Sequence, residues 1–393
     1  MNRHSMNLVF AGGGTLGHLF AGLAVAHELH DLAPATSIHF AGGGSVNERQ
    51  HVEAAGYTYH NISCRPWPRR PWRAAGFLVN NVRGYLGGRR MLRRLRADAV
   101  VGLGGYVSAP IARAAVSLQL PLVLVEQNAL PGRVNRWLSR HAACVCASID
   151  SSAIGRLGQV RLTGAPVRRG FLTPRTEAGH EKLLLVTGGS QGAAALNAAV
   201  PPALSRCQSL LTGWHVIHQT GHREVEVTRR HYHDLGIAAD VAAFVDLPSL
   251  LPHAGLAVCR AGGSTIAELC VTGTPAILCP YPYASDDHQR HNTVAAGDGC
   301  RVVDERFPDF LGRLSCTLST LLANSELRSQ MSQAILRRAR PNASREIARL
   351  VLEGAEAAMI ARAPSRSLFN AARAAMRPAR PPVVKCDSPR SDR

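Results

Sequence analysis

Short apolar runs alternate with stretches of helical periodicity along most of the chain. Two of these runs, 7–11 and 183–187, are each followed by a Gly-rich turn and then by Leu and Ala residues at helical spacing. Continuous apolar strands of this kind are typical of parallel sheets that helices cover on both faces. The pattern predicts an α/β protein with two Rossmann-like, doubly wound lobes that face each other across a cleft. The other predicted strands are 37–41, 98–103, 121–125 and 144–148 in the first half and 214–219, 256–259 and 275–279 in the second.

A cluster of Gly, Pro and Arg at 164–174 marks the expected boundary between the lobes. We therefore expect a first lobe over residues 1–166 and a second over 167–340. A last helix is predicted at about 341–362, and we expect it to cross back to the first lobe. Residues 363–393 contain seven bases, two acids and many Pro, Ser and Ala residues, so we expect a disordered tail.

The composition is that of a folded protein. Of the 393 residues, 46% are apolar and 18% are charged, and no apolar run approaches the ~20 residues of a membrane-spanning helix. The first residues run into a Gly-rich turn without the apolar segment and cleavage site of a secretory signal, so we expect a cytoplasmic protein. The ten Cys include no C-x-x-C pair, which indicates free buried thiols and no structural metal.

Positive charge is concentrated in one aromatic-rich segment. The chain has a formal net charge of +18, and the segment that begins with Arg65 and ends with Arg96 holds ten Arg and no acid. Trp67, Trp72, Phe77 and other apolar residues lie between these Arg. This mixture is typical of a membrane surface segment, whose rings enter the headgroup region while guanidinium groups attract anionic lipid. Single-stranded nucleic acid would use the same chemistry, and a solvated basic helix covering a core would look similar.

The first Gly-rich turn has the spacing of a dinucleotide-binding loop. Gly12, Gly14 and Gly17 match G-x-G-x-x-G, but the next predicted strand ends in three glycines at 42–44 where an acid for the ribose is expected, and the chain contains no P-loop. What remains is a helix N-terminus whose N–H groups attract an anion or a polar substrate. His18 lies at this helix start, where a neutral imidazole suits a general base; a helix-capping, structural His is the alternative.

Two further Gly-rich turns precede predicted helices in the second half. Ser190 lies in the first of them, and Ser264 and Thr265 lie in the second. Their hydroxyl groups can donate to phosphate, while Glu268, one turn later, can accept from a diol such as ribose. Together these turns predict a pocket for a nucleoside diphosphate. Because no D-x-D pair occurs, we expect no divalent metal there, and N–H dipoles, hydroxyl groups and Arg168 would meet the charge of the leaving group.

Five ordered motifs carry a resemblance to a known family. They are G-G-T-L-G-H at 13–18, G-G-Y-V-S-A-P at 104–110, E-Q-N-A-L-P-G at 126–132 with Asn135, G-G-S-Q-G-A at 188–193, and the run 244–292. From about residue 7 to about residue 356 the chain resembles the MurG family, whose members glycosylate the undecaprenyl-diphosphate-linked muramoyl-pentapeptide of peptidoglycan. The resemblance implies a GT-B glycosyltransferase, peripheral on the cytoplasmic face of the inner (cell) membrane.

The resemblance also implies the reaction and its partners. GlcNAc would pass from UDP-GlcNAc to the 4-hydroxyl of the muramoyl-pentapeptide of lipid I, giving lipid II, in an inverting step without metal or cofactor. The implied partners are UDP-GlcNAc, the lipid-linked acceptor and an anionic membrane surface that binds segment 65–96, with no nucleic acid.

Roles for individual residues follow from the same resemblance. The first lobe would hold the acceptor, with its lipid diphosphate on the first Gly-rich loop. The reaction needs a base for the acceptor proton, and His18 is the candidate, with Glu126 a weaker one. Thr15, Gly17, Tyr106 and Asn128 would surround the reacting groups. The donor would lie on the second lobe, with uracil near Phe244 and Val245, diphosphate near Ser190, Ser264 and Thr265, ribose on Glu268, and GlcNAc near His288 and Gln289. Gln191 and Arg168 are also expected to bind substrate.

Three positions depart from the usual family pattern: Leu16 replaces a Gly, Ala21 a Pro, and Ala165 an Asn. Leu16 could narrow the acceptor loop or forbid a positive φ there. Three other functions share part of the pattern: a UDP-sugar:diacylglycerol glycosyltransferase, a UDP-GlcNAc 2-epimerase and a non-enzymatic nucleic-acid-binding module. Acceptor assays, isomerisation of UDP-GlcNAc without acceptor, and salt-dependent RNA binding distinguish them.

Overall fold

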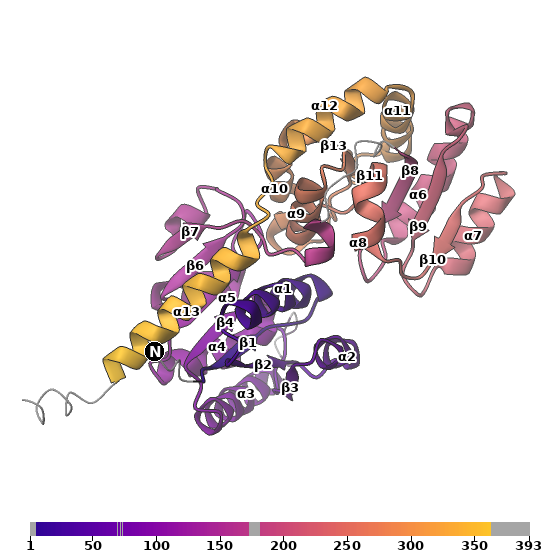
Figure 1. The fold of residues 1–393 in the computed structure, drawn as a ribbon. Helices are drawn as coiled ribbons and strands as arrows, with labels where there is room; N and C mark the ends of the chain where they lie inside the picture. The colour runs from indigo at the N-terminus through magenta and orange to yellow at the C-terminus, as the bar shows by residue number, and fades with distance from the viewer. Residues whose placement is uncertain (1–4, 69, 71, 73, 173–180, 363–393) are drawn as a thin grey trace, which may run out of the picture.

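The computed structural model describes residues 5–68, 70, 72, 74–172 and 181–362, which form two α/β lobes (Figure 1). Each lobe is built on one parallel sheet. The strands of the first lobe are β1 (Asn7–Ala11), β2 (Ser37–Gly42), β3 (Thr58–Asn61), β4 (Ala99–Gly102), β5 (Leu122–Glu126), β6 (Cys144–Ala147) and β7 (Val160–Leu162). The strands of the second lobe are β8 (Glu181–Thr187), β9 (His215–Gln219), β10 (Asp240–Ala242), β11 (Ala254–Cys259), β12 (Ala276–Leu278) and β13 (Cys300–Val302).

The first sheet has the strand order β3-β2-β1-β4-β5-β6-β7, and helices cover both of its faces. Alternate residues of β1 show this, because Leu8 and Phe10 belong to one hydrophobic cluster while Val9 and Ala11 belong to another. Such two-sided burial explains why the central strands are continuously apolar. The helices of this part of the chain are α1 (Leu16–Leu32), α2 (Val46–Ala54), α3 (Ala74–Arg94), α4 (Gly105–Ser117) and α5 (Arg133–Leu138).

The second sheet has the order β10-β9-β8-β11-β12-β13 and the same construction. On β8, Leu184 and Val186 pack into one cluster, and Leu183 and Leu185 pack into the other. The helices here are α6 (Ala194–Ser205), α7 (Val225–Asp234), α8 (Leu247–Leu250), α9 (Gly263–Thr272), α10 (His288–Asn292), α11 (Phe310–Ala323) and α12 (Ser325–Leu336).

The last helix, α13 (Ala343–Arg362), follows the second lobe in sequence but packs on the first. Figure 1 shows it lying along the first lobe, and α1 is one of its main contacts. Its apolar face, with Ile347, Ala348, Val351 and Ala355, belongs to the core of the first sheet. The chain therefore crosses between the lobes twice, which ties their relative position to two covalent connections.

The predicted fold class is confirmed: two parallel, doubly wound sheets carry helices on both faces. Four strands were not predicted, namely β3, β7, β10 and β13, and they are the four edges of the two sheets. The tail expected at 363–393, residues 173–174 of the expected boundary, and Arg69 and Arg73 of the basic segment lie outside the described residues.

Candidate active site between the lobes

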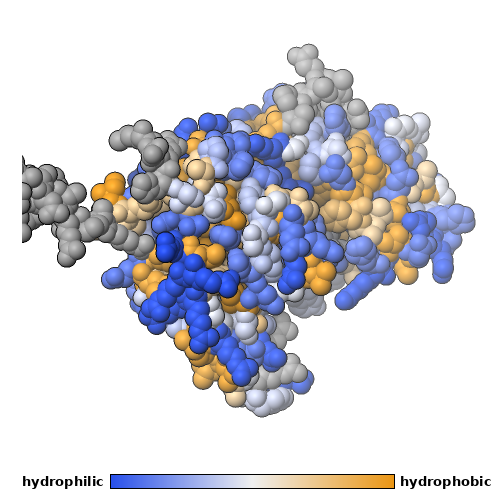
Figure 2. Space-filling model, turned by 60° about the horizontal axis from the view of Figure 1, so that its bottom comes forward, coloured by the Kyte–Doolittle hydropathy of each residue, from blue (hydrophilic) through white to orange (hydrophobic). Residues whose placement is uncertain are grey.

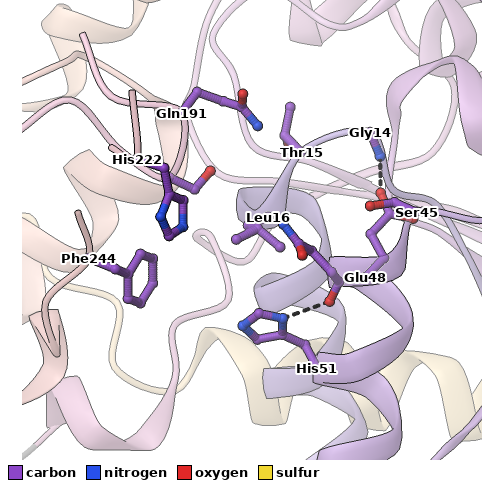
Figure 3. Close-up of a pocket in the computed structure, with 11 residues that line it drawn as sticks. Gly14, Thr15, Leu16, Ser45, Glu48, His51, Gln191, His222 and Phe244 are labelled. Carbon is purple, nitrogen blue, oxygen red and sulfur yellow. Dashed lines mark hydrogen bonds between the residues drawn. The ribbon is translucent and has the colours of Figure 1, made fainter. Parts of the chain in front are cut away.

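A cavity of about 240 Å³ lies between the lobes, where loops leave the carboxyl ends of the strands. In Figure 3 side chains from both lobes face a common space, with His51 of α2 on one side and His222 and Phe244 on the other. The lining consists of Gly14, Thr15, Leu16, Ser45, Asn47, Glu48, His51, Ser190, Gln191, His222 and Phe244. The first and second Gly-rich turns are thus two walls of one cavity.

The imidazole of His18 is held at the start of α1, beside the loop that leads into α4. A Cβ added to Gly104 would come within 3.5 Å of its Nε2 atom, so the ring lies directly over the Gly104 backbone. Its Nδ1 atom is 2.9 Å from the hydroxyl of Thr15. Burial, with a smaller contribution from the neighbouring His288, lowers the pKa of His18 from 6.5 to about 4. The ring is therefore neutral at pH 7 and can accept a proton.

Glu126, at the end of β5, has a different environment. Its carboxylate is buried and accepts hydrogen bonds from the backbone N–H groups of Asn128 (3.0 Å) and Gly132 (2.8 Å) and from the side chains of Asn128 (3.2 Å) and Asn135 (2.9 Å). Burial raises the pKa of Glu126, and these donors oppose the rise. The carboxylate thus fixes the loop that carries Asn128.

Asn292, at the end of α10, joins this loop to the second lobe. Its Oδ1 atom accepts from the N–H of Ala129 at 2.9 Å, and its Nδ2 atom donates to Oδ1 of Asn128 at 3.0 Å and to the carbonyl of Ala261 at 3.1 Å. The side chain is completely buried. A buried amide with both ends paired across two lobes stabilises one relative position of those lobes.

The N-terminus of α9 meets the first lobe at two glycines. A Cβ on Gly263 would come within 2.1 Å of the carbonyl oxygen of Gln127, and one on Gly17 would come within 3.0 Å of Oγ of Ser264. Only glycine allows the first of these approaches. The helix starts that bear His18 and Ser264 with Thr265 therefore face each other at close range.

The second Gly-rich turn is held by Gln219, which ends β9 and is completely buried. Its Nε2 atom donates to the carbonyl of Gly189 at 3.0 Å, and its Oε1 atom accepts from the N–H of Val245 at 3.1 Å. One side chain thus fixes both the turn that bears Ser190 and the segment that bears Phe244, the position expected for uracil.

Glu268 lies one turn into α9 and faces Arg168, which precedes the second sheet. Burial raises the pKa of Glu268 to about 7, and the charge of Arg168 opposes this rise. The guanidinium of Arg168 stacks on Phe20 of α1, 4.3 Å from the ring centroid, and on Phe171. Arg168 therefore connects the helix of His18 to the helix of Glu268.

The remaining expected residues lie around the same cleft. Gln289 accepts from the N–H of Tyr281 at 2.9 Å, and Nδ1 of His288 donates to the carbonyl of Ser285 at 2.8 Å. Tyr106 is 41% exposed, and a Cβ on Gly14 would come within 3.6 Å of its ring. Within the described ranges, no three His, Cys, Asp or Glu side chains lie close enough together to hold a metal ion.

Leu16, the departure in the first loop, starts α1 and has no positive φ. The side chain lines the cavity and packs on the core of the first sheet. Leu16 is therefore compatible with the backbone of the loop, and it narrows the cavity.

The Arg-rich segment 65–96 also exposes large apolar side chains, on a surface around α3. Trp67 and Trp72 are each 72% exposed, and Leu78 is 62% exposed. The opposite face of α3, with Met91 and Leu92, packs against the core. Figure 2, which brings the lower side of Figure 1 forward, shows hydrophobic patches beside strongly hydrophilic ones on this side. Among the described helices, none is long and apolar enough to cross a membrane.

Three residues of this site had no role assigned from the sequence: Glu48, Gln219 and Asn292. Each lies outside the Gly-rich turns and acts by hydrogen-bonding a loop that is distant in sequence. The only available signal was a polar residue directly after an apolar strand or within a short helix, which is a common feature of loops.

Comparison with known proteins gives consistent results. The N-terminal domain model of glycosyltransferase family 28 matches residues 8–147, and its C-terminal domain model matches residues 183–347. The chain is 35% identical over 387 residues to the UDP-N-acetylglucosamine–N-acetylmuramyl-(pentapeptide) pyrophosphoryl-undecaprenol N-acetylglucosamine transferase of Anaeromyxobacter dehalogenans strain 2CP-1, covering 96% of this chain and 99% of that protein.

Two further proteins support the match. The transferase of the same name from Acidithiobacillus ferrooxidans strain ATCC 53993 is 38% identical over 364 residues, covering 88% of this chain and 97% of the relative. The crystal structure of Acinetobacter baumannii MurG is similar with a TM-score of 0.70 at 28% identity, covering 88% of this chain and 99% of that one.

Proposed function

The chain belongs to the UDP-N-acetylglucosamine–N-acetylmuramyl-(pentapeptide) pyrophosphoryl-undecaprenol N-acetylglucosamine transferases of glycosyltransferase family 28, and from this we propose what it does. It transfers GlcNAc from UDP-GlcNAc to the 4-hydroxyl of the muramoyl-pentapeptide of undecaprenyl-diphosphate lipid I. The product is lipid II, an intermediate of peptidoglycan synthesis. The functional units are residues 1–166 with α13, which take the acceptor, and residues 167–340, which take the donor.

One observation carries the proposal for the site. The N-termini of α1 and α9, each preceded by a Gly-rich turn, come from opposite lobes and meet at the cleft. The α1 start brings a neutral His18, and the α9 start brings Ser264, followed by Thr265, against Gly17. An imidazole on one side and N–H and hydroxyl donors on the other suit a base and a leaving diphosphate.

In this mechanism the acceptor hydroxyl attacks the anomeric carbon of GlcNAc from the face opposite UDP, and the configuration inverts in one displacement. His18 accepts the hydroxyl proton. Glu126 is the weaker candidate because four hydrogen bonds already occupy its carboxylate oxygens. Its role is to position Asn128, which lies near the reacting groups with Thr15 and Tyr106.

The charge that develops on UDP is met without a metal ion. Ser190, Gln191 and the N-terminus of α9 face the diphosphate, and Arg168 adds a positive charge. Each donor of this kind typically lowers the barrier by about 2.7 to 4 kcal/mol. Phe244 and Val245 hold uracil, Glu268 holds the ribose, and His288 and Gln289 hold GlcNAc.

The enzyme docks on the cytoplasmic face of the membrane through the surface around α3. Exposed Trp67, Trp72 and Leu78, together with the exposed Arg83 and Arg90 of α3, support this role. Apolar side chains enter the headgroup boundary, and the Arg residues attract anionic lipid. The docked enzyme then meets an acceptor that is itself anchored in the bilayer.

The test is to incubate the protein with UDP-[¹⁴C]GlcNAc and lipid I in detergent, with EDTA present, and to extract the lipid. We expect label in the lipid phase from the wild type and almost none from His18→Ala. Label in UDP-N-acetylmannosamine without acceptor would instead identify a 2-epimerase, and label in diacylglycerol a different lipid glycosyltransferase. Either result would overturn the proposal.

A further inference from the structure

Glu48, in α2 of the first lobe, holds the first Gly-rich turn in place and lines the cavity beside it. Its Oε1 atom accepts from the N–H of Gly14 at 2.6 Å, an interaction drawn in Figure 3. Its Oε2 atom accepts from the hydroxyl of Tyr59 at 3.1 Å, and the Tyr59 oxygen accepts from the N–H of Gly44 at 3.0 Å. A chain of hydrogen bonds thus links the loops that follow β1 and β2 through one carboxylate.

The backbone of the turn is built around this carboxylate. Gly13 has φ +150°, and a Cβ added there would lie 2.7 Å from Oε1 of Glu48. A side chain at position 13 would therefore strain the backbone and displace the carboxylate. Just after this turn, the hydroxyl of Thr15 lies 2.9 Å from Nδ1 of His18, so the position of the turn sets the position of the imidazole.

The charge of Glu48 is compensated by donors and not by a cation. The side chain is 5% exposed, and no basic side chain of the described part of the chain forms an ion pair with it. It takes the N–H of Gly14, next to the start of α1, which is the type of group that otherwise attracts an anionic ligand. The first turn therefore already contains one negative charge, on a side chain that also lines the cavity between the lobes.

We propose that Glu48 is a positioning residue of the transfer reaction that also limits where the acceptor diphosphate binds. It fixes the turn so that Thr15 and His18 face the cleft. Because the N–H of Gly14 is occupied, the diphosphate binds farther along the turn, near Thr15, and within range of the Glu48 charge. This inference rests on the proposed function.

Two substitutions separate the two effects. Glu48→Gln keeps an oxygen for the N–H of Gly14 but removes the charge. We expect kcat within about threefold of the wild type, and inhibition by inorganic pyrophosphate, competitive with lipid I, at about three- to tenfold lower concentration, because a nearby like charge is gone. Glu48→Ala removes the hydrogen bonds too, and we expect kcat to fall at least about tenfold because His18 is no longer held in place.

The controls use the same helix and the same hydrogen-bond chain. Gln50→Ala changes an exposed residue of α2 and should match the wild type in kcat and in pyrophosphate inhibition. Tyr59→Phe removes one donor to Glu48 and should give a kcat between those of the wild type and Glu48→Ala. This second variant, with Glu48→Gln, keeps the test valid if Glu48→Ala does not fold, which its melting curve would show.

The inference is wrong if Glu48→Ala keeps the kcat of Gln50→Ala, or if pyrophosphate inhibits Glu48→Gln and the wild type equally. Its failure differs from that of the proposed function. A wild type that labels no lipid contradicts the function itself, whereas a wild type that labels lipid, with unchanged Glu48 variants, contradicts only the role of Glu48.

Discussion

The α-carbon of Gly17 in the first lobe lies so close to Ser264 in the second that a methyl group on Gly17 would come within 3.0 Å of the serine hydroxyl. The contact joins the N-terminal turns of α1 and α9, the two helices that carry His18 and the expected diphosphate donors. The close approach of these helix starts thus depends on the absence of a side chain at position 17, as it also does at Gly263.

This contact predicts a graded effect of side-chain size at Gly17. Ser264 can shift by a few tenths of an ångström, so Gly17→Ala should lower kcat only a few-fold, whereas Gly17→Val should lower it more than about tenfold because the helix starts cannot meet. Calorimetry should show UDP affinity close to that of the wild type in both. Gly155→Ala is the control, because a Cβ there meets nothing within 4 Å. Equal kcat values for the two Gly17 variants would show that side-chain size at this contact does not limit turnover.

His18→Ala should lower kcat by about 10²- to 10⁴-fold and leave UDP-GlcNAc affinity nearly unchanged, because a general base acts on the acceptor proton. Burial lowers the pKa of His18 to about 4, so the free enzyme keeps a neutral imidazole well below pH 6.5. At saturating donor, kcat/KM for lipid I should therefore stay level from pH 7.5 to about pH 5.5. An acid limb at the ordinary histidine pKa would contradict a neutral ring.

The central strands of both sheets could be predicted from the sequence, and the edges could not, for a physical reason. A strand with neighbours on both sides and helices on both faces is continuously apolar, as in Leu183–Leu184–Leu185. An edge strand has one neighbour and partial contact with water, so β3 reads Thr-Tyr-His-Asn and β13 reads Cys-Arg-Val. These short polar runs resemble loops.

The same limit applies to the site. Gly-rich turns carry a local signature, and so Thr15, Ser190 and Ser264 could be selected as candidates from the sequence. The residues that hold the loops of the site in place could not be selected in this way, because Gln219 and Asn292 form hydrogen bonds with segments 26 or more residues away. Which buried amide reaches which loop is decided by how the sheets and lobes pack. The sequence alone does not indicate which distant segments lie next to each other in the folded protein.

Asn128 and Asn292 should be energetically coupled. Asn292→Ala leaves the N–H of Ala129 and the Oδ1 atom of Asn128 without this partner, which costs about 1–3 kcal/mol, so kcat/KM should fall roughly fivefold to 150-fold. Asn128→Ala combined with Asn292→Ala should lose less than the sum of the two, with a coupling of about 0.5–3 kcal/mol. The exposed Asn342 provides the control, Asn342→Ala. Additive losses would mean that the two amides act separately.

The surface around α3 predicts lipid binding that depends on two exposed rings. Trp67→Ala combined with Trp72→Ala should weaken binding to phosphatidylglycerol vesicles roughly tenfold in a sedimentation assay, since two large side chains no longer enter the headgroup region. Turnover of a detergent-soluble acceptor should not change. Tyr283→Ala removes a ring that is 80% exposed on the second lobe and should bind like the wild type. If the Trp variant also binds normally, docking uses another surface.

Glu268 should make donor binding depend on pH. Burial raises its pKa to about 7, so the carboxylate loses its charge as the pH falls from 8 to 6. A protonated carboxyl group accepts more weakly from the ribose hydroxyls, so UDP-GlcNAc should bind about five- to tenfold more weakly at pH 6 than at pH 8. UDP-GlcNAc is preferred to UDP for this calorimetry, because a terminal phosphate with a pKa near 6 would titrate in the same range. Glu268→Gln should bind more weakly at pH 8 and show no such change between the two pH values.

A wild type whose affinity is constant from pH 8 to pH 6 would contradict this prediction in one of two ways. Either Glu268 ionises outside this pH range, or the ribose binds elsewhere. The Gln variant separates the two, because its affinity at pH 8 falls only if the ribose contacts Glu268.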